Sequence, residues 1–308
     1  MLLLMMARMY QVKRVSKSEF IPLRGLQYHV QVWGQPAPDQ TPLVMVHGWM
    51  DVAASYQFVV DALHAGHYVI APDWRGFGQT EVPDADHFWF PDYLADLDFL
   101  LDHYAPDQAI HLVGHSMGGN VAMLYAGVRP ERVRRLINLE GFGMPRTVPA
   151  QAPGRYARWM DELKSLRQGQ RDMRSYDSLE AVAERLMKNN LRLGRDKALW
   201  LAGHWARESS PGQWHILGHP AHKITNAQLY RVDEVQEIYH RISAPTLCVE
   251  ACDNSMDQWW KGTYNLDEFH ARIQAVQRLE MAHIANAGHM LHHDQPEQLA
   301  ALIERFIA

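Results

Sequence analysis

Short, continuously apolar runs alternate with helical patterns along most of this 308-residue chain. Residues 42–46 have the composition of a strand buried on both faces, and residues 92–104 repeat leucines at helical spacing. This alternation predicts an α/β fold, with a mostly parallel sheet between helices. The other expected strands are 26–33, 68–71, 110–113, 133–139, 246–250 and 278–282, and the other expected helices are 56–63, 120–128, 266–276 and 296–307.

The alternation stops near residue 142 and resumes near residue 243. The block between them shows helical patterns, at 155–167, 179–188 and 196–207, and no clear buried strand. We therefore expect a core domain of residues 1–141 and 243–308, with residues 142–242 inserted as a helical cap. An apolar underside of that cap is expected from four tryptophans, Trp159, Trp200, Trp205 and Trp214.

Composition excludes several classes of protein. Apolar residues make up 47% and charged residues 21%, and the net charge is -5, so the chain is globular and has no bulk attraction to nucleic acid. Two cysteines cannot form a disulfide scaffold. The apolar stretch at residues 2–6 is too short for a signal-peptide core or a membrane span. We expect a cytoplasmic monomer or homodimer with no membrane span and no nucleic-acid partner.

The strongest chemical signal is the motif Gly114-His115-Ser116-Met117-Gly118-Gly119, which follows a predicted strand and precedes a predicted helix. This G-x-S-x-G pattern is typical of a nucleophile elbow, a tight turn that presents a serine at the end of a sheet. The glycines are needed because the turn leaves no room for larger neighbours. The following helix directs its N-terminal amides and the positive end of its dipole toward developing negative charge. Ser116 is therefore the predicted nucleophile.

Two further motifs carry a family resemblance. Val46-His47-Gly48-Trp49 follows one predicted strand, and Asp73-Trp74-Arg75-Gly76-Phe77-Gly78 follows the next. With the serine motif, they resemble the α/β-hydrolase fold superfamily, and finer details resemble its serine-hydrolase-like branch. The resemblance implies an eight-stranded, mostly parallel sheet. It also implies an oxyanion hole made by the backbone N–H groups of Trp49 and Met117.

A histidine near the C-terminus should be the general base. Gly288-His289, followed by Asp294 and Pro296, resembles the ending of this family, so His289 is the predicted base. A zinc alternative arises from three neighbours, His283, His292 and His293. No second set of residues shows the spacing of metal ligands, so we expect no metal and no cofactor.

The third member of the triad has several candidates. The family usually places its acid in the loop after residues 246–250, at a position that here falls on Asn254, with Asp253 before it and Asp257 after it. An amide cannot stabilise imidazolium as a carboxylate does. One branch of the superfamily places the acid after the preceding strand, where Glu140 stands. Because ligands bind at the carboxyl ends of such strands, Glu140 is the predicted acid and Asp253 the alternative.

These residues predict a hydrolase that cleaves a small-molecule carboxylic ester through an acyl-enzyme. Carbon–carbon bond hydrolysis of a diketone-like substrate is an alternative for the same triad, and cofactor-free oxygenation and a non-catalytic binding protein are others. Fold alone does not choose among them. Trp205 and Trp259 are expected to contact the substrate.

Overall fold

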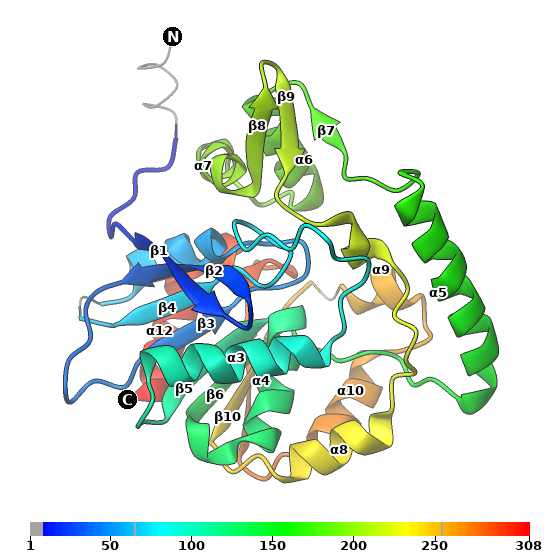
Figure 1. Ribbon diagram of the computed structural model, residues 1–308. Helices are drawn as coiled ribbons and strands as arrows, with labels where there is room; N and C mark the ends of the chain where they lie inside the picture. Colours follow the sequence, from blue (N-terminus) through cyan, green and yellow to red (C-terminus); the bar gives the residue numbers. More distant parts are fainter. Residues whose placement is uncertain (1–8, 65, 254) are drawn as a thin grey trace.

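An eight-stranded sheet forms the centre of the molecule (Figure 1). The computed structural model describes residues 9–64, 66–253 and 255–308, so the apolar stretch at residues 2–6 lies outside the described residues. The strand order is β1-β2-β4-β3-β5-β6-β10-β11. The strands are β1 Lys17–Leu23, β2 Leu26–Trp33, β3 Leu43–Val46, β4 Val69–Pro72, β5 Ile110–His115, β6 Val133–Leu139, β10 Thr246–Ala251 and β11 Leu279–Ile284.

Strands β1 and β2 pair in antiparallel fashion, β2 is antiparallel to β4, and the remaining pairs are parallel. The predicted eight-stranded, mostly parallel sheet is therefore confirmed. The edge strand β1 is not among the strands expected from the sequence, because it has only two buried residues, Ile21 and Leu23.

Strand β3 shows why the central strands are apolar throughout. Its four residues are completely buried. Val44 and Val46 belong to the core on one face of the sheet, whereas Leu43 and Met45 belong to the core on the other. Successive side chains of a strand point to opposite faces, so both faces must be covered.

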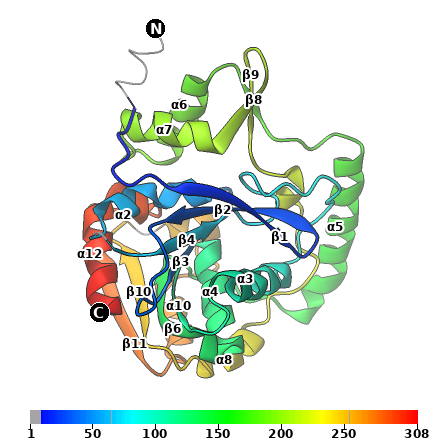
Figure 2. The same cartoon turned by 60° about the vertical axis from the view of Figure 1, so that its left-hand side comes forward.

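Helices provide that cover on both faces (Figures 1 and 2). The first core contains residues of α3, α4, α8 and α10, and the second contains residues of α2 and α12. These helices are α2 Gln57–Ala62, α3 Pro91–Tyr104, α4 Met117–Val128, α8 Val232–His240, α10 Leu266–Ile273 and α12 Pro296–Ile307. Among the described residues, no helix is both long enough and apolar enough to cross a membrane.

The 142–242 segment contains the three expected helices and a small antiparallel sheet of order β7-β9-β8 that the sequence did not predict. Its elements before α8 are α5 Ala152–Arg167, β7 Ser175–Tyr176, α6 Leu179–Asn189, α7 Arg195–Trp205, β8 Ala206–Ser210 and β9 Gln213–Ile216. The helix expected over 196–207 ends at Trp205, because the next residues extend to pair with β9. Helix α8, in contrast, packs on α4 of the main core.

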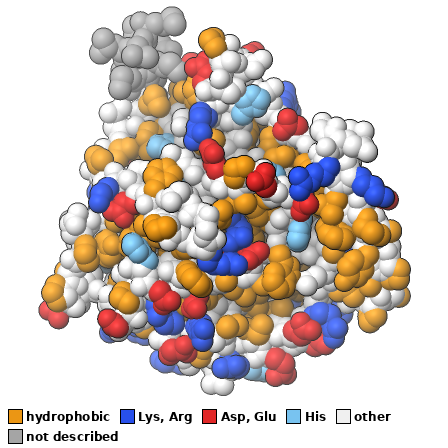
Figure 3. Space-filling view, in the orientation of Figure 1, with side chains coloured by type: hydrophobic (Ala, Val, Ile, Leu, Met, Phe, Trp, Pro, Cys, Tyr) orange, Lys and Arg blue, Asp and Glu red, His pale blue; other side chains and the backbone are white. Residues whose placement is uncertain are grey.

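Figures 1 and 2 show α6, α7 and the small sheet on one side of the main sheet. They have their own apolar cluster, in which Val182 and Ala202 are fully buried and to which Phe58 of α2 also belongs. Helix α5 lies apart from this cluster. Tyr156 and Met160 of α5 are about half exposed, and apolar side chains gather on that face in Figure 3.

Candidate active site

Ser116 occupies the sharp turn between β5 and α4. Its backbone has φ 53° and ψ -116°, a strained conformation for a residue with a Cβ. Two hydrogen bonds hold the turn: the Ser116 N–H donates to the Leu139 carbonyl (2.8 Å), and the Asn120 N–H donates to the Ser116 carbonyl (3.0 Å). The first ties the elbow to the end of β6. Such strain at a polar residue that follows the end of a central strand is typical of a functional position.

Glycine is required on both sides of the serine. A Cβ at Gly114 would overlap the Gly118 carbonyl, and one at Gly118 would overlap the Val46 carbonyl. The start of α4 therefore lies directly against β5 and the end of β3. This contact is what presents Ser116 beside the loop that follows β3.

That loop, residues 47–52, lies against the elbow. A Cβ on Gly48 would come within 3.1 Å of the Ser116 Cβ. The buried His47 ring anchors the loop, since its Nε2 accepts a hydrogen bond from the Trp74 N–H (2.9 Å). Trp49 follows Gly48 directly, and Met117 is the first residue of α4, where N–H groups have no partner within the helix. The sequence predicts these two residues as the oxyanion hole.

His289 and Glu140 meet beside the elbow. The Nδ1 of His289 lies 3.2 Å from Oε2 of Glu140. The Glu140 side chain is buried, and its Oε1 accepts a hydrogen bond from the Ala251 N–H (2.7 Å). His115, the neighbour of Ser116, donates from Nε2 to the His289 carbonyl (2.7 Å). Glu140 thus orients His289 through Nδ1, which leaves Nε2 available for another partner.

The surroundings of His289 favour its neutral form. Burial lowers the pKa of His289 below its ordinary value of 6.5, and the Glu140 carboxylate opposes this effect. The Trp259 ring stands perpendicular to His289, with ring centroids 4.2 Å apart, and contributes to that burial. A neutral imidazole near pH 7 can accept a proton.

The alternative acids are exposed, unlike Glu140. Asp253 is exposed and forms an ion pair with Arg192 of the 142–242 segment. Asp257 is exposed in the short helix α9, Met256–Trp260. Asn254 lies outside the described residues. Of the predicted acids, the structure brings Glu140 to His289.

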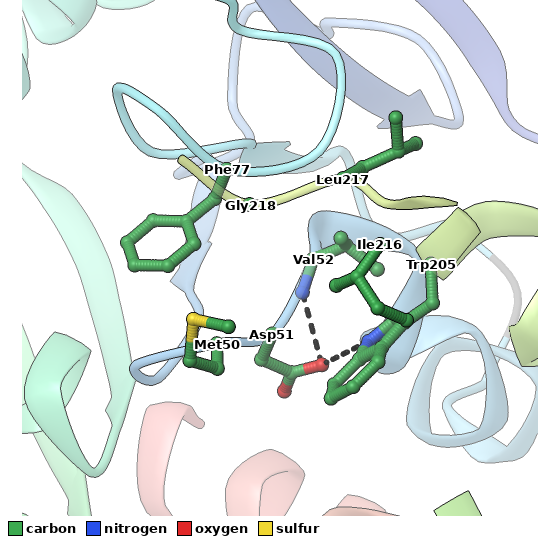
Figure 4. A pocket seen from close by; sticks show the side chains of 8 residues that line it. All are labelled: Met50, Asp51, Val52, Phe77, Trp205, Ile216, Leu217 and Gly218. Carbon is green, nitrogen blue, oxygen red and sulfur yellow. Dashed lines mark hydrogen bonds between the residues drawn. The ribbon is translucent and has the colours of Figure 1, made fainter. Parts of the chain in front are cut away.

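Trp205 contacts the core rather than an open space. Its indole Nε1 donates to Oδ1 of Asp51 (3.1 Å), and both side chains line a narrow pocket (Figure 4). The other lining residues are Met50, Val52, Phe77, Ile216, Leu217 and Gly218. The Gly78 N–H donates to the Leu217 carbonyl (2.8 Å), so the 142–242 segment is joined to the core at this pocket.

Asp51 was not among the predicted site residues, although it follows Trp49 by two positions. Its carboxylate is buried near His292 and His293. The one sequence feature that could have indicated Asp51 as a site residue is its place in the loop after β3. Its partners come from distant parts of the chain, so the sequence did not reveal them. His283, in contrast, is exposed on β11 and lies outside this cluster.

A second Ser-His-Asp arrangement is present elsewhere. The Ser18 Oγ lies 2.7 Å from Nε2 of His29, and Nδ1 of His29 lies 2.7 Å from Oδ2 of Asp73. Ser18, however, is an exposed residue of the edge strand β1 with extended backbone, not a residue of a strand-to-helix turn. Asp73 also accepts hydrogen bonds from the Ala53 and Gln79 N–H groups. These hydrogen bonds provide partners for the oxygens of the buried Asp73 carboxylate.

Comparison with known proteins agrees with the topology. Residues 41–296 match the model of the alpha/beta hydrolase fold family. The chain belongs to this family. The α/β-hydrolase resemblance of the sequence motifs is thereby confirmed, and the matched region contains Ser116, Glu140 and His289.

The relatives of this α/β-hydrolase include several hydrolases. A serine hydrolase-like protein of Danio rerio is 24% identical over 311 residues, which cover 96% of this chain and 89% of that protein. A 2-hydroxy-6-oxo-2,4-heptadienoate hydrolase of Pseudomonas putida is 36% identical over 106 residues, but these cover 33% of this chain and 38% of that protein. These relatives indicate a hydrolase without specifying the bond that it cleaves.

Among solved structures, the thioesterase domain from the curacin biosynthetic pathway superposes with a TM-score of 0.80, at 22% identity, over 94% of this chain and 99% of that domain. This similarity concerns the fold.

Proposed function

We propose that this α/β-hydrolase cleaves a carboxylic ester with Ser116 as nucleophile, His289 as general base and Glu140 as the acid of the triad. The observation that carries the proposal is the strained backbone of Ser116 close to His289, whose Nδ1 lies 3.2 Å from the buried Glu140 carboxylate. An activated serine needs a base within reach and a group that orients the base.

In the first half-reaction, the Ser116 Oγ attacks the ester carbonyl carbon while Nε2 of His289 takes the hydroxyl proton. The tetrahedral intermediate collapses, the ester C–O bond breaks, and His289 returns the proton to the leaving alcohol. In the second half-reaction, water attacks the acyl-enzyme and gives its proton to His289. The carboxylic acid is released, and Ser116 regains its proton.

The negative oxygen of each intermediate would be stabilised by the N–H groups of Trp49 and Met117. Met117 begins α4, a helix of 12 residues whose dipole places positive partial charge at this end. Donors that are already oriented stabilise developing charge without reorganisation. The role of Glu140 is to hold His289 in the required tautomer and to stabilise its imidazolium form.

The 142–242 segment would act as the cap of this site. Its junction with the core, through Trp205, Leu217 and Gly218, adjoins the loop that carries Trp49. Trp259, from α9, lies against His289. A cap in this place would exclude water and select substrates by shape.

A second candidate is hydrolysis of a carbon–carbon bond in a diketone-like substrate. The observation that favours it is the partial similarity to the 2-hydroxy-6-oxo-2,4-heptadienoate hydrolase of P. putida. The same serine, base and oxyanion donors would serve both reactions, so the substrate must distinguish them.

A fluorophosphonate probe, followed by mass spectrometry of the labelled peptide, tests the nucleophile. We expect stoichiometric labelling at Ser116, and none in Ser116→Ala. Ser18→Ala is the matched control, since Ser18 also contacts a histidine that is paired with an aspartate, and it should be labelled like the wild type. Labelling that survives in Ser116→Ala would refute the assignment. Rates on p-nitrophenyl esters of increasing chain length, compared with a 2-hydroxy-6-oxo-dienoate, then separate ester from carbon–carbon hydrolysis.

A further inference from the structure

Three buried side chains form a cluster near the His289 segment. They are Asp51, from the loop after β3, and His292 and His293, from the short helix α11, Leu291–Asp294. One ligand atom from each lies within 4.8 Å of the others. Their exposed fractions are 3%, 0% and 5%.

Four buried polar atoms of these side chains lack hydrogen-bond partners within the described part of the chain. They are Oδ2 of Asp51, both ring nitrogens of His292, and Nε2 of His293. His292 Nε2 lies 3.6 Å from Asp51 Oδ2, which is too long for a hydrogen bond. Leaving a buried polar atom unpaired costs roughly 1–3 kcal/mol, so several of them together indicate a missing partner.

The carboxylate of Asp51 is already oriented for such a partner. Its Oδ1 accepts hydrogen bonds from the Val52 N–H (2.9 Å), the Trp205 indole (3.1 Å) and the Ser55 hydroxyl. These donors fix the plane of the carboxylate and leave Oδ2 directed to the histidines. A ligand that is held by other hydrogen bonds in this way is a usual feature of metal sites.

We propose that Asp51, His292 and His293 bind one divalent cation of borderline softness, of the Zn²⁺ class. Two imidazole nitrogens and a carboxylate oxygen form a common donor set for such ions. The negative charge of Asp51 offsets part of the ion's charge. Lys197 is a cation close to the cluster, and its ammonium donates a hydrogen bond to the His293 carbonyl (3.2 Å).

The ion would join three parts of the molecule. Asp51 belongs to the same loop as Trp49. His292 and His293 follow His289 closely in sequence. Trp205 links Asp51 to the 142–242 segment. Occupancy would therefore stabilise the junction of these parts. The proposal does not depend on the ester hydrolase reaction, since binding and stability report on it directly.

Metal binding can be measured on the whole protein after treatment with EDTA and removal of the chelator. We expect one equivalent of Zn²⁺ to be retained after gel filtration, with a higher melting temperature. Co²⁺ should give the visible absorption of a low-coordinate nitrogen and oxygen site, displaced by Zn²⁺. Asp51→Asn and His293→Phe, which preserve side-chain size, should weaken Zn²⁺ binding at least about tenfold.

His283→Gln is the matched control, because His283 is exposed and outside the cluster, and it should bind Zn²⁺ like the wild type. Wild-type protein that retains no Zn²⁺ and shows no Co²⁺ absorption overturns the proposal. Equal affinity in well-folded Asp51→Asn and His293→Phe also overturns it. If circular dichroism shows either variant to be unfolded, the wild-type Co²⁺ absorption decides.

Discussion

Glu140 and His289 stand 149 residues apart in sequence, yet the carboxylate oxygen Oε2 of one lies 3.2 Å from Nδ1 of the other. Two further hydrogen bonds restrain this contact. The Ala251 N–H holds the second oxygen of Glu140, and Nε2 of His115 holds the backbone of His289. Glu140 has φ 56°, so its side chain leaves the end of β6 in a direction that regular strand geometry does not allow.

Replacing Glu140 tests whether this contact supports catalysis. We expect Glu140→Gln to lower kcat by about 10³–10⁴-fold, because an amide can leave His289 in the wrong tautomer and does not stabilise imidazolium. Asp253→Asn, at the exposed alternative acid, should retain kcat within about twofold of the wild type, because Asp253 is paired with Arg192 rather than with His289. Steady-state kinetics on the best p-nitrophenyl ester provides the measurement. The reverse ranking would assign the acid to Asp253.

The pH dependence of kcat/KM should report the buried state of His289. The neutral imidazole is the active base, so kcat/KM falls as pH drops through the pKa of His289. Burial lowers this pKa, so the midpoint of the acid limb should lie below 6.5, with a plateau at neutral pH.

Trp259→Ala removes the ring that stands against His289 and should raise this midpoint toward 6.5, because desolvation of His289 is reduced. Trp89→Ala is a suitable control, since Trp89 and Trp259 are equally exposed, at 44%, and Trp89 hydrogen bonds to Gln228 instead. A midpoint above 6.5 in the wild type would contradict the role of burial.

The Trp205–Asp51 hydrogen bond should stabilise the junction between the core and the 142–242 segment. We expect Trp205→Phe to lower the free energy of unfolding by about 1.5 kcal/mol, because a hydrogen bond to a charged acceptor is lost. Trp214→Phe, on β9, makes the same change of side chain away from Asp51 and should cost less. Urea denaturation measures both variants, and a larger loss for Trp214→Phe would show that the bond to Asp51 contributes little.

Replacing Gly114 or Gly203 by alanine should change the stability of the protein in opposite directions. Gly114→Ala forces a methyl group into the Gly118 carbonyl and should destabilise the protein by about 3 kcal/mol. Gly203→Ala, at an exposed position in α7 with open space around it, should stabilise the protein by about 0.5–1 kcal/mol. Thermal melting distinguishes the two, and equal stability of both variants would show that the elbow can relax.

Local sequence patterns were sufficient for most of the framework. Strand β6 and helix α12 have the predicted bounds, and the serine motif lies in the predicted strand–turn–helix context. These features depend on side-chain periodicity and on the glycines of one turn, which act over a few residues. The edge strand β1 and the small β7-β9-β8 sheet escaped prediction, because strands with few buried residues lack such a pattern.

Sequence patterns were enough to predict most strands and helices of the main sheet, the position of Ser116 and a histidine near the C-terminus. The three-dimensional fold selects which carboxylate meets His289, because parallel pairing of β6 with β10 brings Glu140 beside Ala251 and toward the His289 loop. It also decided that Asp51, His292 and His293 share one buried point, and that Trp205 contacts Asp51. Such contacts join residues that are distant in sequence, and they depend on how strands pair and how helices pack, which no local pattern records.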